Sequence, residues 1–135
     1  MPYEIVEHKA DVGLHVSGRD LARLFTDAAR GMFFIISEQP PEGWPESHAV
    51  ELEAVDIEQL LVDWLAELLY LFEVKKFFPL DAEIEEIGPG RIKAAVSGLR
   101  TRGAFADTEI KAVTHHLLSV DKTLNGYETT IYFDL

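Results

Sequence analysis

The sequence contains no cysteine among its 135 residues. Without thiols the chain can form no disulfide, no thiolate nucleophile and no zinc–thiolate site, so a bound metal would have to be held by oxygen and imidazole. Long apolar runs are also absent, because none reaches the roughly 18 residues that a membrane-spanning helix needs. Residues 1–4 lead into a strand pattern without a basic or signal-like segment. We therefore expect a cytoplasmic protein that uses hard cations and has no membrane partner.

Basic residues are scarce. The chain has 12 Lys and Arg against 24 Asp and Glu, which gives a formal net charge of -12. Tight binding to a nucleic-acid backbone depends on Lys and Arg that neutralise phosphates, so we expect no direct nucleic-acid binding. A role in RNA metabolism would then act through a partner protein. The alternative is that the acidity only keeps a small protein soluble.

The length fits one domain, residues 1–135, and the 47% hydrophobic content is ordinary for a globular chain. Apolar residues at helical spacing predict two amphipathic helices, over 21–33 after Asp20 and over 57–72 after the capping residue Asp56, with Gln59 at the capping-box position. Three prolines in six residues predict a surface loop over 38–45. Alternation and turn signals predict strands over 3–7, 11–16, 48–54, 82–87, 91–99, 110–120 and 128–135, with an Asn125-Gly126 turn before the last. The expected fold class is α+β, with both helices packed on one mostly antiparallel sheet in a single domain.

Both ends of the chain carry a carboxylate on an expected strand, Asp11 near the start and Asp134 beside the last residue, Leu135. Alternation places Asp11 and Gly13 on the face opposite Val12, and places Asp134 on the face opposite Phe133. If these strands pair, Asp11, Asp134 and the α-carboxylate of Leu135 converge in a site that needs a cation. The alternative is a turn in which Asp11 only bonds nearby amides.

The segment from Ile110 to His116 carries Lys111 and two histidines. In a regular strand His115 and His116 would face opposite ways, so they could not bind one ion together. Lys111 could neutralise a carboxylate cluster or bind a partner's phosphate, although a strand lysine is also typical of a solvated edge. The chain contains no nucleophile elbow, phosphate-binding glycine loop, HExxH or EF-hand pattern, so we expect no catalytic residue.

Four blocks in order resemble the archease family. They are the opening His8-Lys9-Ala10-Asp11-Val12-Gly13, the helix from Leu60 to Tyr70, the Ile110 to His116 segment and the terminal Phe133-Asp134-Leu135. The chain differs from the family's usual pattern at Lys9, where Thr is common, and at His115, where Tyr is common.

The resemblance implies a non-catalytic activator of the GTP-dependent tRNA-splicing ligase, which joins cyclic-phosphate and hydroxyl RNA ends. Members of the family promote guanylylation of the ligase's active-site histidine and restore multiple turnover. Carried over, the metal ligands would be Asp11, Asp134 and Leu135, with calcium expected first and magnesium or manganese as alternatives. His8, Lys111 and His116 become candidates for partner contact or activation.

Two other functions remain open. The family is also associated with chaperone-like modulation of a tRNA cytosine methyltransferase, which would make that enzyme the partner. A metal-dependent hydrolase could use the same carboxylates around an activated water, but the sequence offers no general base for it.

Overall fold

The computed structural model describes residues 2–7, 11–102 and 106–135. The elements follow along the chain in the order β1 (Tyr3–Glu7), β2 (Asp11–Gly18), α1 (Leu21–Ile36), β3 (Trp44–Glu53), α2 (Ile57–Glu73), β4 (Phe77–Gly88), β5 (Arg91–Arg100), β6 (Ala112–Val113), β7 (Asp121–Thr123) and β8 (Gly126–Asp134). The α+β class is confirmed.

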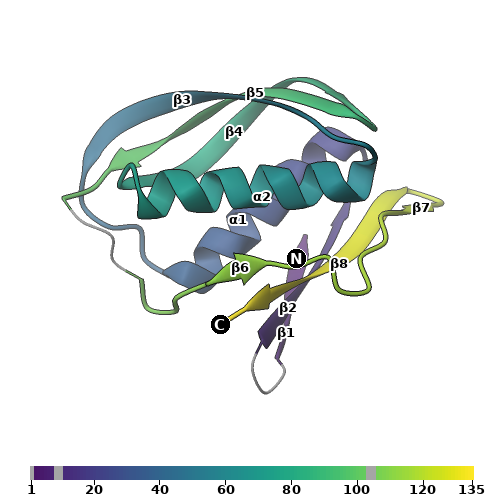
Figure 1. Cartoon of the computed structure of the whole chain (residues 1–135), viewed down its shortest axis with the longest axis horizontal. Coiled ribbons are helices and arrows are strands. Elements are labelled where there is room, and N and C mark those ends of the chain that lie inside the picture. The colour runs from purple at the N-terminus through teal and green to yellow at the C-terminus, as the bar shows by residue number, and fades with distance from the viewer. Residues whose placement is uncertain (1, 8–10, 103–105) are drawn as a thin grey trace.

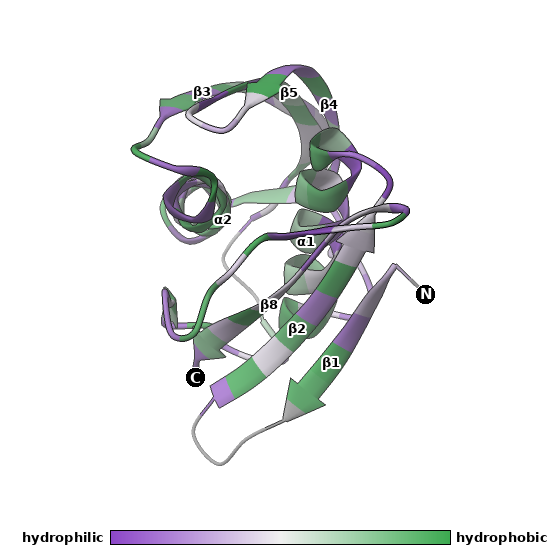
Figure 2. Ribbon diagram, turned by 90° about the vertical axis from the view of Figure 1, so that its right-hand side faces the viewer, coloured by the Kyte–Doolittle hydropathy of each residue, from purple (hydrophilic) through white to green (hydrophobic). Residues whose placement is uncertain are grey.

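The expectation of one sheet is wrong, because the described strands form two antiparallel sheets. One has the order β1-β2-β8-β6, with β7 also paired to β8, and the other has the order β3-β5-β4. The two helices lie between the sheets, as Figures 1 and 2 show from two directions, and α1 packs against both β2 and β4. Each helix has an apolar face too wide for a single sheet to cover, so the second sheet buries the remainder.

The helix starts follow the sequence closely. Asp20 accepts a hydrogen bond from the Arg23 main-chain N–H at the start of α1, and Asp56 accepts one from Gln59 at the start of α2, both over 2.8 Å. Both expected caps are confirmed. The side chain of Gln59 bonds Asp63 over 2.7 Å, and its oxygen contacts His115 over 2.7 Å. Gln59 therefore links α2 to the segment before β7.

The core fills the space between the sheets and the helices. Trp64 of α2 is fully buried, and its indole N–H donates to the Phe25 carbonyl of α1 over 3.0 Å, which joins the two helices at their crossing. Burying the Trp ring is favourable because its only polar group has a partner. The inner face of the five-stranded sheet is formed by Val12, Leu14, Val16, Ile131 and Phe133.

Several strand limits differ from expectation. β3 and β4 begin earlier than predicted and include Pro45 and Pro79, which is tolerated because both are edge strands and β4 has a bulge at Pro79. The long strand expected over 110–120 is only two residues, β6, because the chain turns after Thr114 and Leu117 has a positive φ of 52°. The turn before β8 is formed by residues 124–125, since Thr123 pairs with Gly126.

Among the described residues, neither helix is both long and apolar enough to cross a membrane.

Candidate metal centre

Asp11 and Asp134 lie directly opposite each other across the antiparallel pair of β2 and β8. Their neighbours Val12 and Phe133 are also paired, and both are buried in the core, which holds the two strand ends in place. Directly opposed residues of such a pair point to the same face, with Cβ atoms about 4.5–5.5 Å apart. The two termini therefore bring two carboxylates to one place, and Figure 1 shows the C-terminus beside the start of β2.

Among the described residues, neither Asp11 nor Asp134 has an ion-pair partner. Asp11 is half-buried, and its Oδ1 atom is shielded from solvent with no hydrogen-bond partner among the described residues. Like charges directly opposite each other destabilise a strand pair, and a buried carboxylate oxygen without a partner adds a desolvation cost. A hard cation would remove both penalties, so these residues fit a bound divalent ion.

A hollow of about 460 Å³ opens beside Asp11. Its lining includes Leu135, together with Phe34 and Ile35 from the end of α1. A small ligand in the hollow would therefore contact oxygen ligands as well as apolar side chains. Asp134 is exposed, and its neighbour Leu135 lines the hollow.

Two further carboxylates line this hollow, Glu38 and Asp107, and sequence reasoning missed both. The Asp107 main-chain N–H donates to the Ile36 carbonyl over 2.8 Å, so the end of α1 positions it. Its carboxylate accepts a long bond of 3.5 Å from Ser37. No local pattern marks either residue, because Glu38 falls in the proline-rich segment and Asp107 is placed only by contact with a distant helix.

Side chains alone do not complete a metal shell. Within residues 2–7, 11–102 and 106–135, no three His, Asp or Glu groups lie close enough together to hold an ion. Ca²⁺ takes about 6–8 oxygen ligands, many of them carbonyls and waters. A cation at Asp11 and Asp134 would therefore need main-chain oxygens, such as those of Leu135, and water.

Lys111 reaches this centre through its main chain. Its N–H donates to the carbonyl oxygen of Asp134 over 2.8 Å, and the next residue, Ala112, pairs with Asp134. The Lys111 side chain is exposed and lines a neighbouring hollow with Glu73 and Glu109. The Lys111 main chain thus holds the backbone of Asp134, while its side chain faces the neighbouring hollow.

His116 contacts Tyr132, which lies two residues before Asp134 on the same face of β8. Its ring packs edge-on against Tyr132 at a centroid distance of 5.9 Å, and Tyr132 in turn pairs with Gly13 across β2 and β8. His115 contacts Gln59 on α2, so the two histidines contact different elements, α2 and β8. His8, the remaining candidate, lies outside the described residues.

The comparisons with known proteins agree on one family. A family model described as the archease protein family matches residues 3–135. Protein archease from Methanosarcina acetivorans is 38% identical over 139 residues, which cover 98% of this chain and 95% of that protein. Protein archease from Archaeoglobus fulgidus is 36% identical over 138 residues, with all of both chains covered.

Solved structures show the same architecture. The solution structure of a Methanobacterium thermoautotrophicum protein matches with a TM-score of 0.70 at 25% identity and covers 99% of both chains. The crystal structure of an archease from Thermotoga maritima, described as a possible chaperone, matches with a TM-score of 0.68 at 25% identity and covers 96% of this chain and 94% of that one. With the family model spanning nearly every residue, this chain belongs to the archease family.

Proposed function

We propose that this protein is a non-catalytic activator of the GTP-dependent RNA-splicing ligase, acting through a divalent cation held by Asp11, Asp134 and main-chain oxygen of Leu135. Calcium is the expected ion, and magnesium or manganese could replace it. The observation that carries the proposal is the opposition of Asp11 and Asp134 in a chain that belongs to the archease family.

The residues of the centre and the cation have different roles. Asp11 supplies a shielded oxygen without a hydrogen-bond partner among the described residues, and Asp134 is held by the Lys111 N–H. When bound, the cation supplies concentrated positive charge, which can neutralise phosphate oxygens of the guanylylation reaction. The side chains of Lys111, whose main chain bonds Asp134, and of His116 are exposed and available to a partner.

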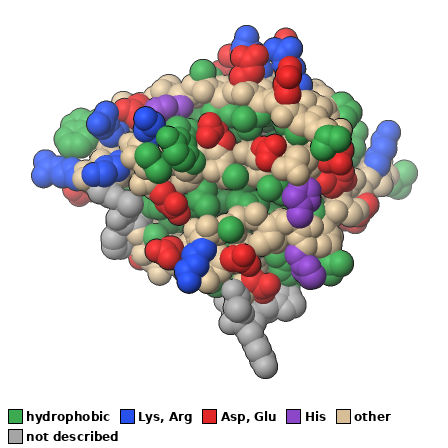
Figure 3. All heavy atoms as spheres, viewed as in Figure 1, with side chains coloured by type: hydrophobic (Ala, Val, Ile, Leu, Met, Phe, Trp, Pro, Cys, Tyr) green, Lys and Arg blue, Asp and Glu red, His purple; other side chains and the backbone are tan. Residues whose placement is uncertain are grey.

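The surface charge suits a basic partner. Figure 3 shows Asp and Glu side chains spread over the face that includes α2 and β8. An RNA ligase must present a basic cleft to its substrate, and an acidic protein is attracted to such a cleft.

The experiment is multiple-turnover RNA ligation and ligase guanylylation with wild-type protein, Asp11→Asn and Asp134→Asn. Both variants should keep the fold and lose stimulation. The matched control is Asp121→Asn, an exposed carboxylate on β7 that should stimulate like wild type. Full stimulation by Asp11→Asn or Asp134→Asn would overturn the role of the cation.

A second function, chaperone-like modulation of a tRNA cytosine methyltransferase, is favoured by the description of the Thermotoga relative as a possible chaperone. Capture from native lysate on immobilised wild-type protein separates the two. Recovery of the methyltransferase without the ligase would favour the second function, and the reverse result would favour the first.

A further inference from the structure

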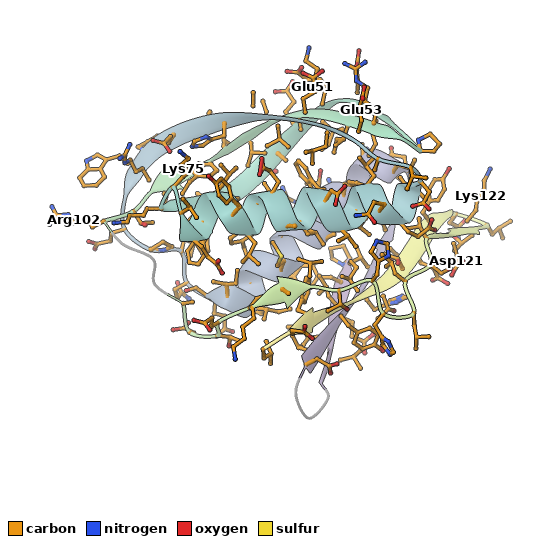
Figure 4. All side chains as sticks on the ribbon, viewed as in Figure 1. Glu51, Glu53, Lys75, Arg102, Asp121 and Lys122 are labelled. Carbon is orange, nitrogen blue, oxygen red and sulfur yellow. The ribbon has the colours of Figure 1, made fainter. Side chains whose placement is uncertain are left out.

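We infer that one end of the three-stranded sheet, formed by Trp44, Lys75, Lys76, Arg100 and Arg102 and called here the basic end, binds single-stranded RNA. The inference goes beyond ligase activation and does not depend on it. Figure 4 labels Lys75 and Arg102 at this end of the molecule and labels Asp121 and Lys122 at the opposite end.

The topology gathers these residues from three strands. β3 begins at Trp44, β5 ends at Arg100, and β4 begins at Phe77, and Arg100 pairs with both Trp44 and Phe77. The Thr101 N–H donates to the Lys76 carbonyl over 2.7 Å, which holds the turn from α2 into β4 against the end of β5. Residues far apart in the sequence therefore share one rim of the sheet.

The basic end carries an exposed aromatic ring. Trp44 is 55% exposed, whereas Trp64, the other tryptophan, is fully buried. The Arg102 guanidinium lies 5.7 Å from the centroid of the Trp44 ring. Both groups line a hollow of about 520 Å³. A planar ring and a planar cation left beside a surface hollow form a platform on which a base can stack.

The basic end carries cations without a carboxylate partner among the described residues, although the chain as a whole is acidic. Most basic residues elsewhere are paired with carboxylates, namely Arg19, Arg23, Arg30, Arg91 and Lys93. Among the described residues Lys75 and Lys76 make no ion pair with a carboxylate, and Arg102 has the Trp44 ring as its contact. Two acidic groups lie nearby, since Glu46 pairs with Arg100 over 3.6 Å and Glu42 lines the hollow. Three cations therefore remain for an anionic ligand.

The chemistry favours RNA over an acidic peptide. An acidic peptide could pair with Lys75 and Lys76, but its side chains offer nothing flat to the exposed ring of Trp44. A single strand offers phosphates to the lysines and bases to the Trp44–Arg102 platform. The net charge of -12 limits this binding to a short footprint, because the rest of the surface repels the backbone. The expectation of no direct nucleic-acid contact was based on total charge, and the uneven distribution of charge is the reason to revise it.

The test is a titration of the full chain with a short oligoadenylate at low salt. Binding is monitored by tryptophan emission and by the fluorescence anisotropy of a labelled strand. Stacking should quench Trp44 while buried Trp64 keeps its emission. Trp44→Ala should weaken binding by about tenfold, which corresponds to one lost stacking contact. The double variant Lys75→Glu/Lys76→Glu should weaken it by at least about tenfold and reduce its salt dependence.

Lys122→Glu is the matched control, an exposed lysine at the opposite end, and should bind within about twofold of wild type. All four proteins should melt alike, because the changed side chains are exposed. Absence of RNA binding at low salt would overturn the inference. Equal losses from Lys122→Glu and Lys75→Glu/Lys76→Glu would also overturn it, as would binding of oligoglutamate but not RNA at the basic end.

Discussion

The main-chain N–H of Lys111 donates a hydrogen bond to the carbonyl oxygen of Asp134 over 2.8 Å. This bond does not depend on the Lys111 side chain, which is exposed. Orientation of Asp134 and the positive charge of Lys111 can therefore be separated by mutation.

Lys111→Met should keep the N–H and so keep metal binding, while ligase stimulation falls if the charge contacts the partner. Lys111→Pro removes the donor and should weaken metal binding as well. Calorimetric calcium titration and ligase turnover report the two properties, with Lys122→Met as the exposed control. Loss of calcium binding in Lys111→Met would show that the side chain acts on the metal centre itself.

Because Asp11 and Asp134 face each other, the effect of Asp11→Asn on stability should depend on whether metal is present. Asp11→Asn removes the repulsion with Asp134, so without metal the variant should be as stable as wild type or up to about 1 kcal/mol more stable. Calcium at roughly 100 times its Kd should stabilise wild type by about 2.7 kcal/mol and the variant far less. Chemical denaturation with calcium and with chelator measures both. Equal calcium stabilisation of Asp11→Asn and wild type would contradict the proposed ligand role.

Gly13 makes room for Tyr132, the ring against which His116 packs. A Cβ added at Gly13 would lie 2.9 Å from the Tyr132 ring and 3.2 Å from the Val6 carbonyl oxygen. Gly13→Ala should therefore destabilise the protein by about 1–3 kcal/mol, the usual cost of overpacking. Gly88→Ala is the matched control, because a Cβ there meets nothing within 4 Å. Thermal melts of both variants check this, and equal stability of the two would show that the Tyr132 ring yields freely.

Local signals predicted the parts of this molecule that depend on neighbouring residues. Alternation placed Asp11 opposite the face of Val12, and Asp134 opposite the face of Phe133, because the side-chain period of a strand is two. Asp20 and Asp56 were found as caps because a cap bonds within its own turn.

Such local signals could not predict contacts between segments that are distant in the sequence. Alternation in residues 48–54 shows a half-buried strand but not which sheet it joins, so the second sheet was missed. Glu38 and Asp107 reach the hollow only because the end of α1 meets the segment before β6. The positive φ of Leu117 ended an expected strand, and a non-glycine residue in that conformation has no sequence signature.

Asp27 of α1 is 1% exposed and lies between two arginines, with Arg23 Nε at 3.2 Å and Arg30 Nη1 at 3.6 Å. Arg30 also pairs with Asp81 of β4 over 2.9 Å, so the cluster ties α1 to the three-stranded sheet. Removing Arg23 leaves a buried carboxylate with less compensation. Arg23→Ala should cost about 1–2 kcal/mol of unfolding free energy, a value reduced by solvent screening at the half-exposed arginine.

A double-mutant cycle tests whether the burial of Asp27 determines the free-energy cost of Arg23→Ala. In an Asp27→Asn background Arg23→Ala should cost clearly less, with a coupling energy of at least about 0.5 kcal/mol. The comparison pair is Arg91 and Glu51, which is shorter at 2.8 Å but has both side chains at least half exposed. Its coupling should fall below about 0.5 kcal/mol, since exposed pairs are screened by water. A larger coupling for Arg91 and Glu51 than for Arg23 and Asp27, measured by urea denaturation, would mean that distance rather than burial decides the strength of these pairs.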